Sequence, residues 1–248
     1  MNSLKFRLAA LAAAGYTQLA RTSRTKDGLR VLMYHDLSHS DSSDLYTLRA
    51  ETFITQLNRL IEWADENDAS FHFVADEPKP GIAVTFDDGY MSTLQIAAPI
   101  LAEHRIPFHV YVSRVFVAGA DRRFLCESSL KDLAAVPGAR IGAHGLSHRP
   151  LATLSIDDQA TELRGSREWL EDVLQIRVHE MSFPHGSHSD DVVRTASSAG
   201  YDIACCSAVG TYVDSSQKMS VPRIDVWSHD DEATVVNKVR GGWDWLMP

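Results

Sequence analysis

Two pairs of side chains in this sequence have the types and spacing of a metal-dependent hydrolytic site. Asp87 and Asp88 are adjacent in the segment TFDDGY, and His144 and His148 lie four positions apart in HGLSH. Two adjacent carboxylates at the end of a strand are costly unless a cation or a proton lies between them. Two histidines at this spacing can aim both imidazoles at one point, as metal-binding pairs do.

One carboxylate and two imidazoles together supply three protein ligands. A structural zinc site normally has four, so three ligands leave positions open for water or substrate, as in catalytic sites. Mixed nitrogen and oxygen ligation predicts one divalent ion, Zn²⁺ before others, although Fe²⁺, Ni²⁺ and Co²⁺ also fit. Taken singly, each pair has a plainer interpretation, because Asp-Asp-Gly is common in turns and H-x-x-x-H arises by chance.

Three further segments place polar residues near the ends of expected strands. Each also has a structural interpretation: a histidine that only makes local hydrogen bonds, a strand-ending turn and a salt bridge. If the same strand ends also hold a metal, His35 becomes a candidate general acid. The segments are MYHD with His35, SFPHG with Pro184 and His185, and PRID with Arg223 and Asp225.

These residues need elements that bring them together, and the sequence alternates short β-rich runs with helical stretches. Helical spacing of apolar residues marks Phe53 to Ala64 and the region of Ile96 to Leu101, and capping serines open helices after Ser155 and Ser189. The alternation predicts an α/β fold with a parallel sheet, most simply a closed barrel, with an open doubly wound sheet as the alternative. The expected strands are 30–34, 70–74, 82–86, 108–112, 140–142, 180–183, 201–206 and 219–226.

Composition limits the classes of partner and compartment. The chain has 248 residues and a formal net charge of −9, which argues against nucleic acid as a partner. Its three cysteines, two of them adjacent, do not form a disulfide framework, so we expect buried thiols in a reducing compartment. No apolar run reaches the roughly 18 residues that a membrane span requires.

The first 28 residues form a separate N-terminal extension in this interpretation, and residues 29–248 form one domain. We expect an amphipathic helix in the extension that packs on the domain or lies on a membrane surface, with a cleaved signal peptide as the alternative. The expected location is therefore cytoplasmic or peripheral to the inner membrane, and a secreted or periplasmic location is the alternative.

In these motifs, the sequence resembles the polysaccharide deacetylase family, the NodB-homology domain of carbohydrate esterase family 4. TFDDG, HGLSH and SFPHG resemble its first three motifs, and the resemblance extends over about 29–245. MYH near the start and PRID near the end resemble the exopolysaccharide-processing branch. The resemblance implies a distorted (β/α)7 barrel and a metal-dependent hydrolase that removes N-acetyl groups from amino sugars of a poly- or oligosaccharide.

The resemblance also implies roles for individual residues. Asp88, His144 and His148 would be the metal ligands, and Asp87 the general base. His35 would be the general acid, with its tautomer set by Asp36 or Asp225. Tyr90, Pro184 and His185 are the candidate substrate and oxyanion residues.

Two departures from the family pattern change these roles. Ser182 stands where many members have an arginine that orients the base, so Arg223 is expected to take over that role from the last strand. His185 replaces a tyrosine whose backbone N–H helps to bind the oxyanion, and a backbone donor survives this change. Two alternatives stay open at this point: a deacetylase or deformylase of a lipid-linked sugar, and a non-catalytic barrel that binds a metal or a glycan.

Overall fold

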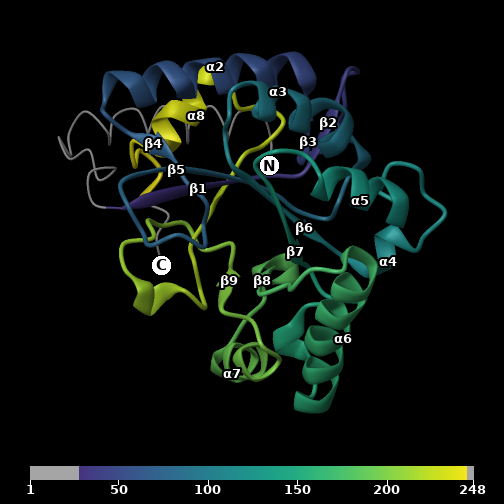
Figure 1. Ribbon diagram of the computed structural model, residues 1–248. Coiled ribbons are helices and arrows are strands. Elements are labelled where there is room, and N and C mark those ends of the chain that lie inside the picture. Colours follow the sequence, from purple (N-terminus) through teal and green to yellow (C-terminus); the bar gives the residue numbers. More distant parts are fainter. Residues whose placement is uncertain (1–27, 245–248) are drawn as a thin grey trace.

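The computed structural model describes residues 28–244 (Figure 1), so the predicted N-terminal extension lies outside the described residues. A parallel sheet runs through the molecule in the strand order β10-β1-β5-β6-β7-β8-β9, with β4 added beside β5. A separate parallel pair, β2 with β3, lies before the first long helix. The strands are β1 (Leu29–Tyr34), β2 (Asp36–Ser38), β3 (Thr47–Arg49), β4 (Ser70–Phe71), β5 (Gly81–Phe86), β6 (Phe108–Val112), β7 (Ala139–Ala143), β8 (Glu180–Ser182), β9 (Ile203–Cys205) and β10 (Ile224–Asp225).

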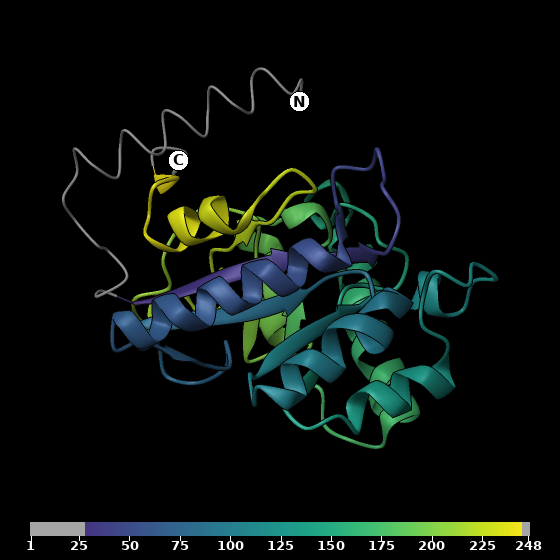
Figure 2. The same cartoon turned by 90° about the horizontal axis from the view of Figure 1, so that it is seen from above.

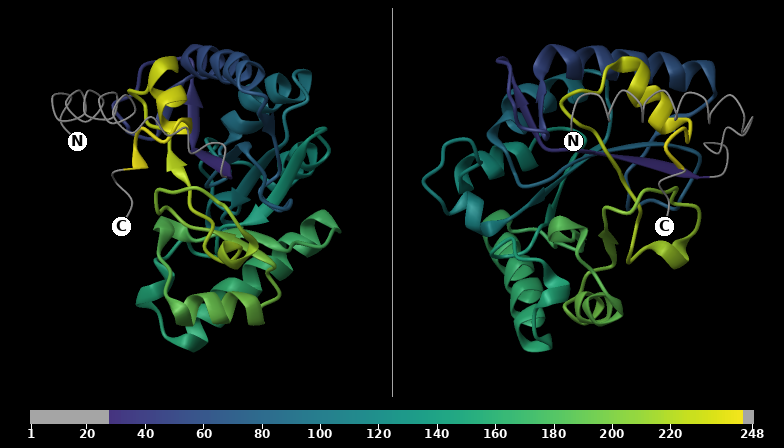
Figure 3. Two further views of the ribbon diagram at one scale, coloured as in Figure 1. Left: turned by 90° about the vertical axis from the view of Figure 1, so that its left-hand side faces the viewer. Right: turned by 180° about the vertical axis from the view of Figure 1, so that it is seen from behind.

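The segment that follows β9 along the chain brings the two edges of the sheet together. The Val221 amide donates to Ala204 at 2.9 Å on the β9 edge, and the Val226 amide donates to Met33 at 2.9 Å on the β1 edge. The sheet is therefore strongly curled, as the side view in Figure 3 shows. This confirms the predicted distorted (β/α)7 barrel and excludes the alternative, an open doubly wound sheet.

The period-two alternation of the strands separates two apolar cores. Outward-facing residues such as Val84 and Phe108 pack against the helices, whereas Val31, Ala83 and Tyr111 belong to a smaller cluster inside the barrel. Counting onward in steps of two from Ala83 gives Thr85 and Asp87, and counting from Val221 gives Arg223 and Asp225. The same alternation that fills the interior thus aims the polar residues at its carboxyl end.

Helices cover the outside of the sheet, and α2 and α8 lie side by side along one flank (Figure 2). Ser155 and Ser189 cap α6 and α7 as predicted, with their hydroxyls accepting from the amides of Asp158 and Val192. Within residues 28–244, no helix has the length and apolar character to cross a membrane. The helices are α2 (Ala50–Glu66), a π-helical turn η2 (Thr93–Ala97), α3 (Ala98–Glu103), α4 (Arg114–Val117), α5 (Glu127–Ala134), α6 (Ile156–Leu174), α7 (Asp190–Ser198), α8 (Glu232–Val239) and the 3₁₀ turns η3 (Leu151–Thr153), η4 (Pro184–Gly186) and η5 (Ser215–Gln217).

Four of the predicted strands, 70–74, 180–183, 201–206 and 219–226, are shorter than expected, and two short strands were missed. The run 219–226 pairs with β9 at one end and with β1 at the other, so only Ile224–Asp225 forms a regular strand. Strand β4 ends at Phe71 because the chain then turns across the amino end of the barrel, where the Val74 amide donates to His109. Strands β2 and β3 have three residues each, too few for a periodic pattern to show.

Candidate active site

A cavity of about 390 Å³ opens at the carboxyl end of the barrel strands, which is where catalytic groups gather in barrels of this kind. Eight of the ten residues selected from the sequence line it: His35, Asp87, Asp88, Tyr90, His144, His148, His185 and Asp225. Of the other two, Arg223 lies buried behind Asp87, and Pro184 lies against the turn that contains Gly145. The structure thus brings the separate sequence segments to one place.

Sharp turns aim several of these side chains. Asp88, His148 and His185 have φ angles of 71°, 57° and 58°, in the left-handed region that most residues avoid. Such conformations cost about 1–3 kcal/mol each and persist only where the surrounding structure holds them. Half of the non-glycine residues with positive φ in residues 28–244 thus lie around the cavity.

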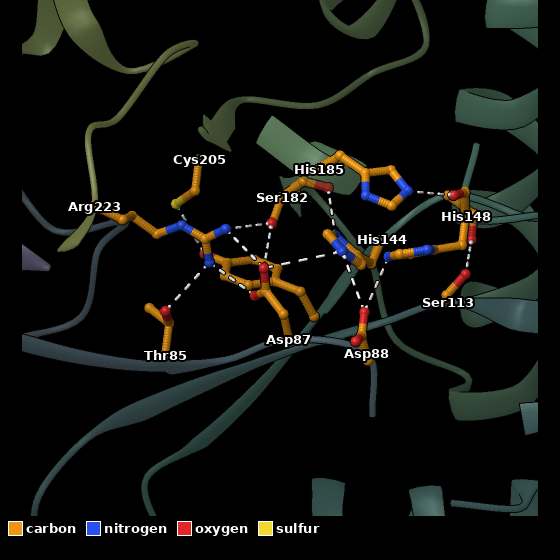
Figure 4. A network of polar contacts seen from close by, with 12 residues as sticks. Thr85, Asp87, Asp88, Ser113, His144, His148, Ser182, His185, Cys205 and Arg223 are labelled. Atoms are coloured by element: carbon orange, nitrogen blue, oxygen red, sulfur yellow. Dashed lines mark hydrogen bonds and ion pairs between the residues drawn. The ribbon is translucent and has the colours of Figure 1, made fainter. Parts of the chain in front are cut away.

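Asp88, His144 and His148 each present one ligand atom to a common point. These three atoms lie within 4.8 Å of one another. Asp88 Oδ1 lies 3.1 Å from His148 Nε2 and 3.5 Å from His144 Nε2, and Figure 4 shows both imidazoles turned toward this carboxylate. Burial disfavours the charged form of Asp88, but the nearby imidazoles of His148, His144 and His35 together outweigh burial, and the pKa of Asp88 is lowered.

The protonation pattern of His144 shows why this cluster suits a cation. His144 Nδ1 lies 2.8 Å from the carbonyl oxygen of Ser182, which can only accept, so Nδ1 carries the proton. Burial lowers the pKa of His144, which favours the neutral ring. Its Nε2 then presents a lone pair to the buried Oδ1 of Asp88, which lies 3.5 Å away. Two acceptors face each other, and the donor set therefore fits a divalent cation.

Asp87, whose Oδ2 lies 3.9 Å from His144 Nε2, is held by a different set of contacts. Both its oxygens accept from Arg223, Nη1 to Oδ1 and Nη2 to Oδ2, each at 2.7 Å. The Ser182 hydroxyl donates to Oδ2 at 3.0 Å and accepts from Arg223 at 2.8 Å. Burial would raise the pKa of Asp87, but the Arg223 guanidinium, together with His144 and His35, outweighs burial and holds this pKa far below its usual range. Asp87 is therefore ionised at any physiological pH.

Every N–H of the buried Arg223 guanidinium has an acceptor. Beyond the two bonds to Asp87 and the one to Ser182, Nη1 donates to Thr85 at 3.2 Å and Nε donates to the Cys206 carbonyl at 3.0 Å. These five bonds, most of which Figure 4 shows, use the full donor capacity of the side chain. Arg223 thus makes the contacts with Asp87 that are expected of the residue that orients the proposed base.

His35 and Asp225 both line the cavity and interact electrostatically with each other. The His35 imidazole packs against the ring of Tyr46 with 4.6 Å between ring centres. Burial raises the pKa of Asp225, and the nearby His35 partly opposes this rise. Asp36, the other candidate to orient His35, accepts instead from Ser92 at 2.7 Å. Of the two candidates, Asp225 is therefore the one that shares the cavity with His35.

The three candidate substrate residues differ in their placement. His185 is exposed on the rim, where its Nε2 donates to the His148 carbonyl at 3.1 Å. Tyr90 lines the cavity with its ring 4.5 Å from that of Phe124. Pro184 is buried and does not reach the cavity, because the 3₁₀ turn η4 packs its ring over the neighbouring turn.

Sequence reasoning missed several residues of the site. Asp44, Tyr46 and Ser207 line the cavity, and the Ser182 hydroxyl bridges Asp87 and Arg223. Asp44 and Tyr46 lie between the short strands β2 and β3 in a segment that contains no recognisable motif. In the sequence, Ser182 stands out only because it replaces an arginine, and its hydroxyl contacts with Asp87 and Arg223 leave no sequence signal.

Comparison with known proteins agrees with this geometry. The family model described as polysaccharide deacetylase matches residues 75–204. YxkH of Bacillus subtilis (strain 168), also classed with the polysaccharide deacetylases, is 24% identical over 189 residues. That match covers 73% of this chain and 65% of YxkH, so the chain spans slightly less than two thirds of its relative.

Two solved structures share the fold across most of the chain. The Streptococcus pyogenes deacetylase PplD, solved in complex with acetate, has a TM-score of 0.71 at 19% identity, covering 86% of this chain and 98% of that one. IcaB from Ammonifex degensii has a TM-score of 0.69 at 21% identity, covering 86% of this chain and 97% of that one. The family model matches more than half of the sequence, and the matched span includes the segments TFDDG, HGLSH and SFPHG. The chain therefore belongs to the polysaccharide deacetylase family.

Proposed function

We propose that this protein is a metal-dependent hydrolase that removes N-acetyl groups from amino sugars of a poly- or oligosaccharide. One observation carries the proposal: two unprotonated acceptors, His144 Nε2 and Asp88 Oδ1, face each other beside an ionised carboxylate, Asp87. A binding protein needs only the ligand cluster. The additional carboxylate, held by a buried arginine at the same cavity, supports hydrolysis.

Asp88, His144 and His148 would hold the divalent ion, Zn²⁺ before Fe²⁺, Ni²⁺ or Co²⁺. Such an ion would supply Lewis acidity, which lowers the pKa of water and polarises an amide carbonyl. The hydrogen bond from His144 Nδ1 to the Ser182 carbonyl fixes the ring so that Nε2 faces the site. Three ligands leave room for water and for the acetyl group.

Asp87 would take the proton of the attacking water. Arg223 and Ser182 hold the carboxylate in one orientation with 2.7 Å and 3.0 Å bonds, so no rearrangement is needed at the moment of attack. Its lowered pKa makes it a weak base, and the water must therefore be acidified by the bound ion. The backbone N–H of His185, on the cavity wall, is the proposed donor to the oxyanion.

His35 would protonate the amine as it leaves, because an amine departs poorly without a proton. The carboxyl of Asp225 lies on the same wall and interacts electrostatically with the imidazole, which supports a role in orienting it. The two proton-transfer residues, Asp87 and His35, come from the neighbouring strand ends of β5 and β1. A sugar bound across this mouth would meet both.

The substrate is an N-acetylated carbohydrate, and the exopolysaccharide-processing branch is the one that the MYH and PRID segments favour. A lipid-linked amino sugar is the competing substrate. Location at the cytoplasmic side or the periphery of the inner membrane remains part of this proposal, because the extension that would mediate it lies outside residues 28–244.

The test is release of acetate from N-acetylglucosamine oligomers, with metal removed by a chelator and then restored. We expect activity to disappear with the metal and to return with Zn²⁺ or Co²⁺. The Asp88→Asn variant should contain no metal and release no acetate. Metal-independent acetate release would refute the proposed mechanism. If acetate is released from a lipid-linked sugar but not from the oligomers, the lipid-linked sugar is the substrate instead of the polymer.

A further inference from the structure

The turn between the two ligand histidines is held by a residue that no motif includes, Glu162 of α6. Its Oε2 accepts from the backbone amides of Leu146 and Ser147, both at 2.9 Å, and its Oε1 contacts the Ser147 hydroxyl. Glu162 is 7% exposed, so water contributes little to its solvation. We infer that Glu162 is a positioning residue that pre-forms the metal site by fixing this turn. The inference rests on the proposed function, because it assumes a metal between His144 and His148.

The carbonyls of the same turn are held from the opposite side. The Gly145 carbonyl accepts from the Ser113 hydroxyl and the Arg114 amide, each at 3.3 Å, and the Leu146 carbonyl accepts from the Val115 amide at 2.8 Å. The turn is thus fixed on both edges, its amides by α6 and its carbonyls by the chain that follows β6. Figure 4 shows Ser113 beneath this turn, next to His148.

Local conformation shows why the turn needs the contacts of Glu162 with Leu146 and Ser147, here called the brace. Gly145 and His148 have φ angles of 76° and 57°, and the second is unfavourable for a histidine. A Cβ at Gly145 would lie 3.2 Å from Pro184 and 3.5 Å from Glu162 Oε2, so the turn fits closely against both. Without the brace, the turn would relax and the two imidazoles would no longer converge on Asp88. The burial of Pro184, which does not reach the cavity, belongs to this same packing.

The choice of a carboxylate is also explained by the donors that it meets. Two amides and one hydroxyl need acceptors on two oxygens, and Glu162 offers acceptors only. Glutamine can still accept both amides on one oxygen, while its NH₂ group donates to the Ser147 hydroxyl. Alanine removes all three bonds and leaves two amides without partners in a buried turn. The two substitutions therefore separate hydrogen bonding from charge.

The test is the affinity of the metal-free protein for Zn²⁺, measured by competition with a chromogenic chelator, together with the visible spectrum of the Co²⁺ form. Glu162→Ala should bind Zn²⁺ about 10–100-fold more weakly, as outer-shell substitutions do, and should alter the Co²⁺ spectrum. Glu162→Gln should stay close to the unmodified protein. Glu168→Ala, an exposed site on the same helix, is the matched control and should change neither readout.

Unchanged affinity in Glu162→Ala would overturn the inference, and equal losses in the alanine and glutamine variants would replace the brace by a charge effect. Hydrogen exchange gives a second measurement that requires no variant: the amides of Leu146 and Ser147 should be protected in the metal-free protein. Exchange at the rate of an open loop would also overturn the inference. Protection of these amides in a protein that releases no acetate would retain the brace and reject the proposed function.

Discussion

The two ends of the barrel both bury a histidine beside a carboxylate, but a different ring nitrogen faces the carboxylate at each end. At the amino end, His109 Nε2 accepts from the Val74 amide at 2.9 Å, so the neutral ring carries its proton on Nδ1. That Nδ1 lies 2.6 Å from Glu180 Oε2, and a donor thus meets an acceptor. At the carboxyl end, His144 Nδ1 is bound to a carbonyl, and its Nε2 faces Asp88 as an acceptor facing an acceptor.

This difference separates a structural site from a functional one on the same inward-facing positions. At the amino end, Glu180 faces Arg140 at 3.6 Å as well as His109, so groups of the chain itself surround this carboxylate. At the carboxyl end, the facing acceptors leave the place for the cation that the proposed function requires. Which nitrogen of a buried histidine is engaged therefore tells more about function than the presence of a histidine–carboxylate pair.

The largest expected effect at the carboxyl end comes from Asp87→Asn. The variant should retain its metal but lose about 10²–10⁴-fold in kcat, the usual range when a general base is removed. It should also unfold more readily, by about 3–5 kcal/mol, because Arg223 keeps a buried charge without its partner. Acetate release and metal content, both measured well below the melting temperature, check this prediction. Full activity would remove Asp87 from the mechanism.

His35→Gln should lower kcat on an N-acetyl sugar by about 10²–10³-fold, because no acid protonates the leaving amine. An acetyl ester with a nitrophenolate leaving group needs no such proton, so the variant should hydrolyse that ester almost as fast as the unmodified protein. Comparison of the two substrates isolates the acid role. Equal losses on both would mean that His35 acts in binding or in packing against Tyr46.

Arg223→Lys keeps a positive charge but loses the paired hydrogen bonds to Asp87. A displaced carboxylate should lower kcat by about 100-fold, the usual effect of a misplacement near 1 Å. KM and metal content should change little, since Arg223 does not line the cavity. A change in KM with constant kcat would show that Arg223 serves substrate binding rather than Asp87.

The smallest effect on catalysis is expected at the amino end, where Glu180→Gln should leave kcat and metal content unchanged. Stability should fall by about 1–2 kcal/mol at neutral pH, since the variant exchanges a charge-assisted hydrogen bond for a neutral one. Burial would raise the pKa of Glu180, but His109 outweighs it, and the pKa is lowered in the folded state. The carboxylate therefore stabilises the fold above the unfolded pKa of about 4.3.

That stabilisation is lost as the pH falls below this value toward the lowered pKa of the folded state. The difference in unfolding free energy between the variant and the unmodified protein should therefore shrink in acid. Denaturant titrations at several pH values measure it. A loss of activity at constant stability would contradict the division between the two ends.

The sequence predicted the carboxyl end better than the amino end. Asp87, Asp88, His144 and His148 follow strands in short motifs, so their convergence follows from a parallel barrel. The capping serines of α6 and α7 were equally readable. Such signals are local, because a few neighbouring residues determine each of them.

Long-range pairings left no such signal. Glu162 reaches its turn from a helix, and the Ser182 hydroxyl acquires its role only when Arg223 arrives from the last strand. His109 and Glu180 are 71 positions apart and read as unrelated residues of two strands. Pro184 was expected at the cavity but lies outside it, because a strand-end motif does not show which of its residues point inward.

The most direct test of the account is a crystal structure of the Asp87→Asn variant loaded with Zn²⁺ and an N-acetylglucosamine oligomer. We predict one ion on Asp88 Oδ1, His144 Nε2 and His148 Nε2, with the acetamide group between residue 87 and His35. An ion bound elsewhere, or an acetamide group outside the cavity, would contradict the central claim that the facing acceptors form the centre of a deacetylase site.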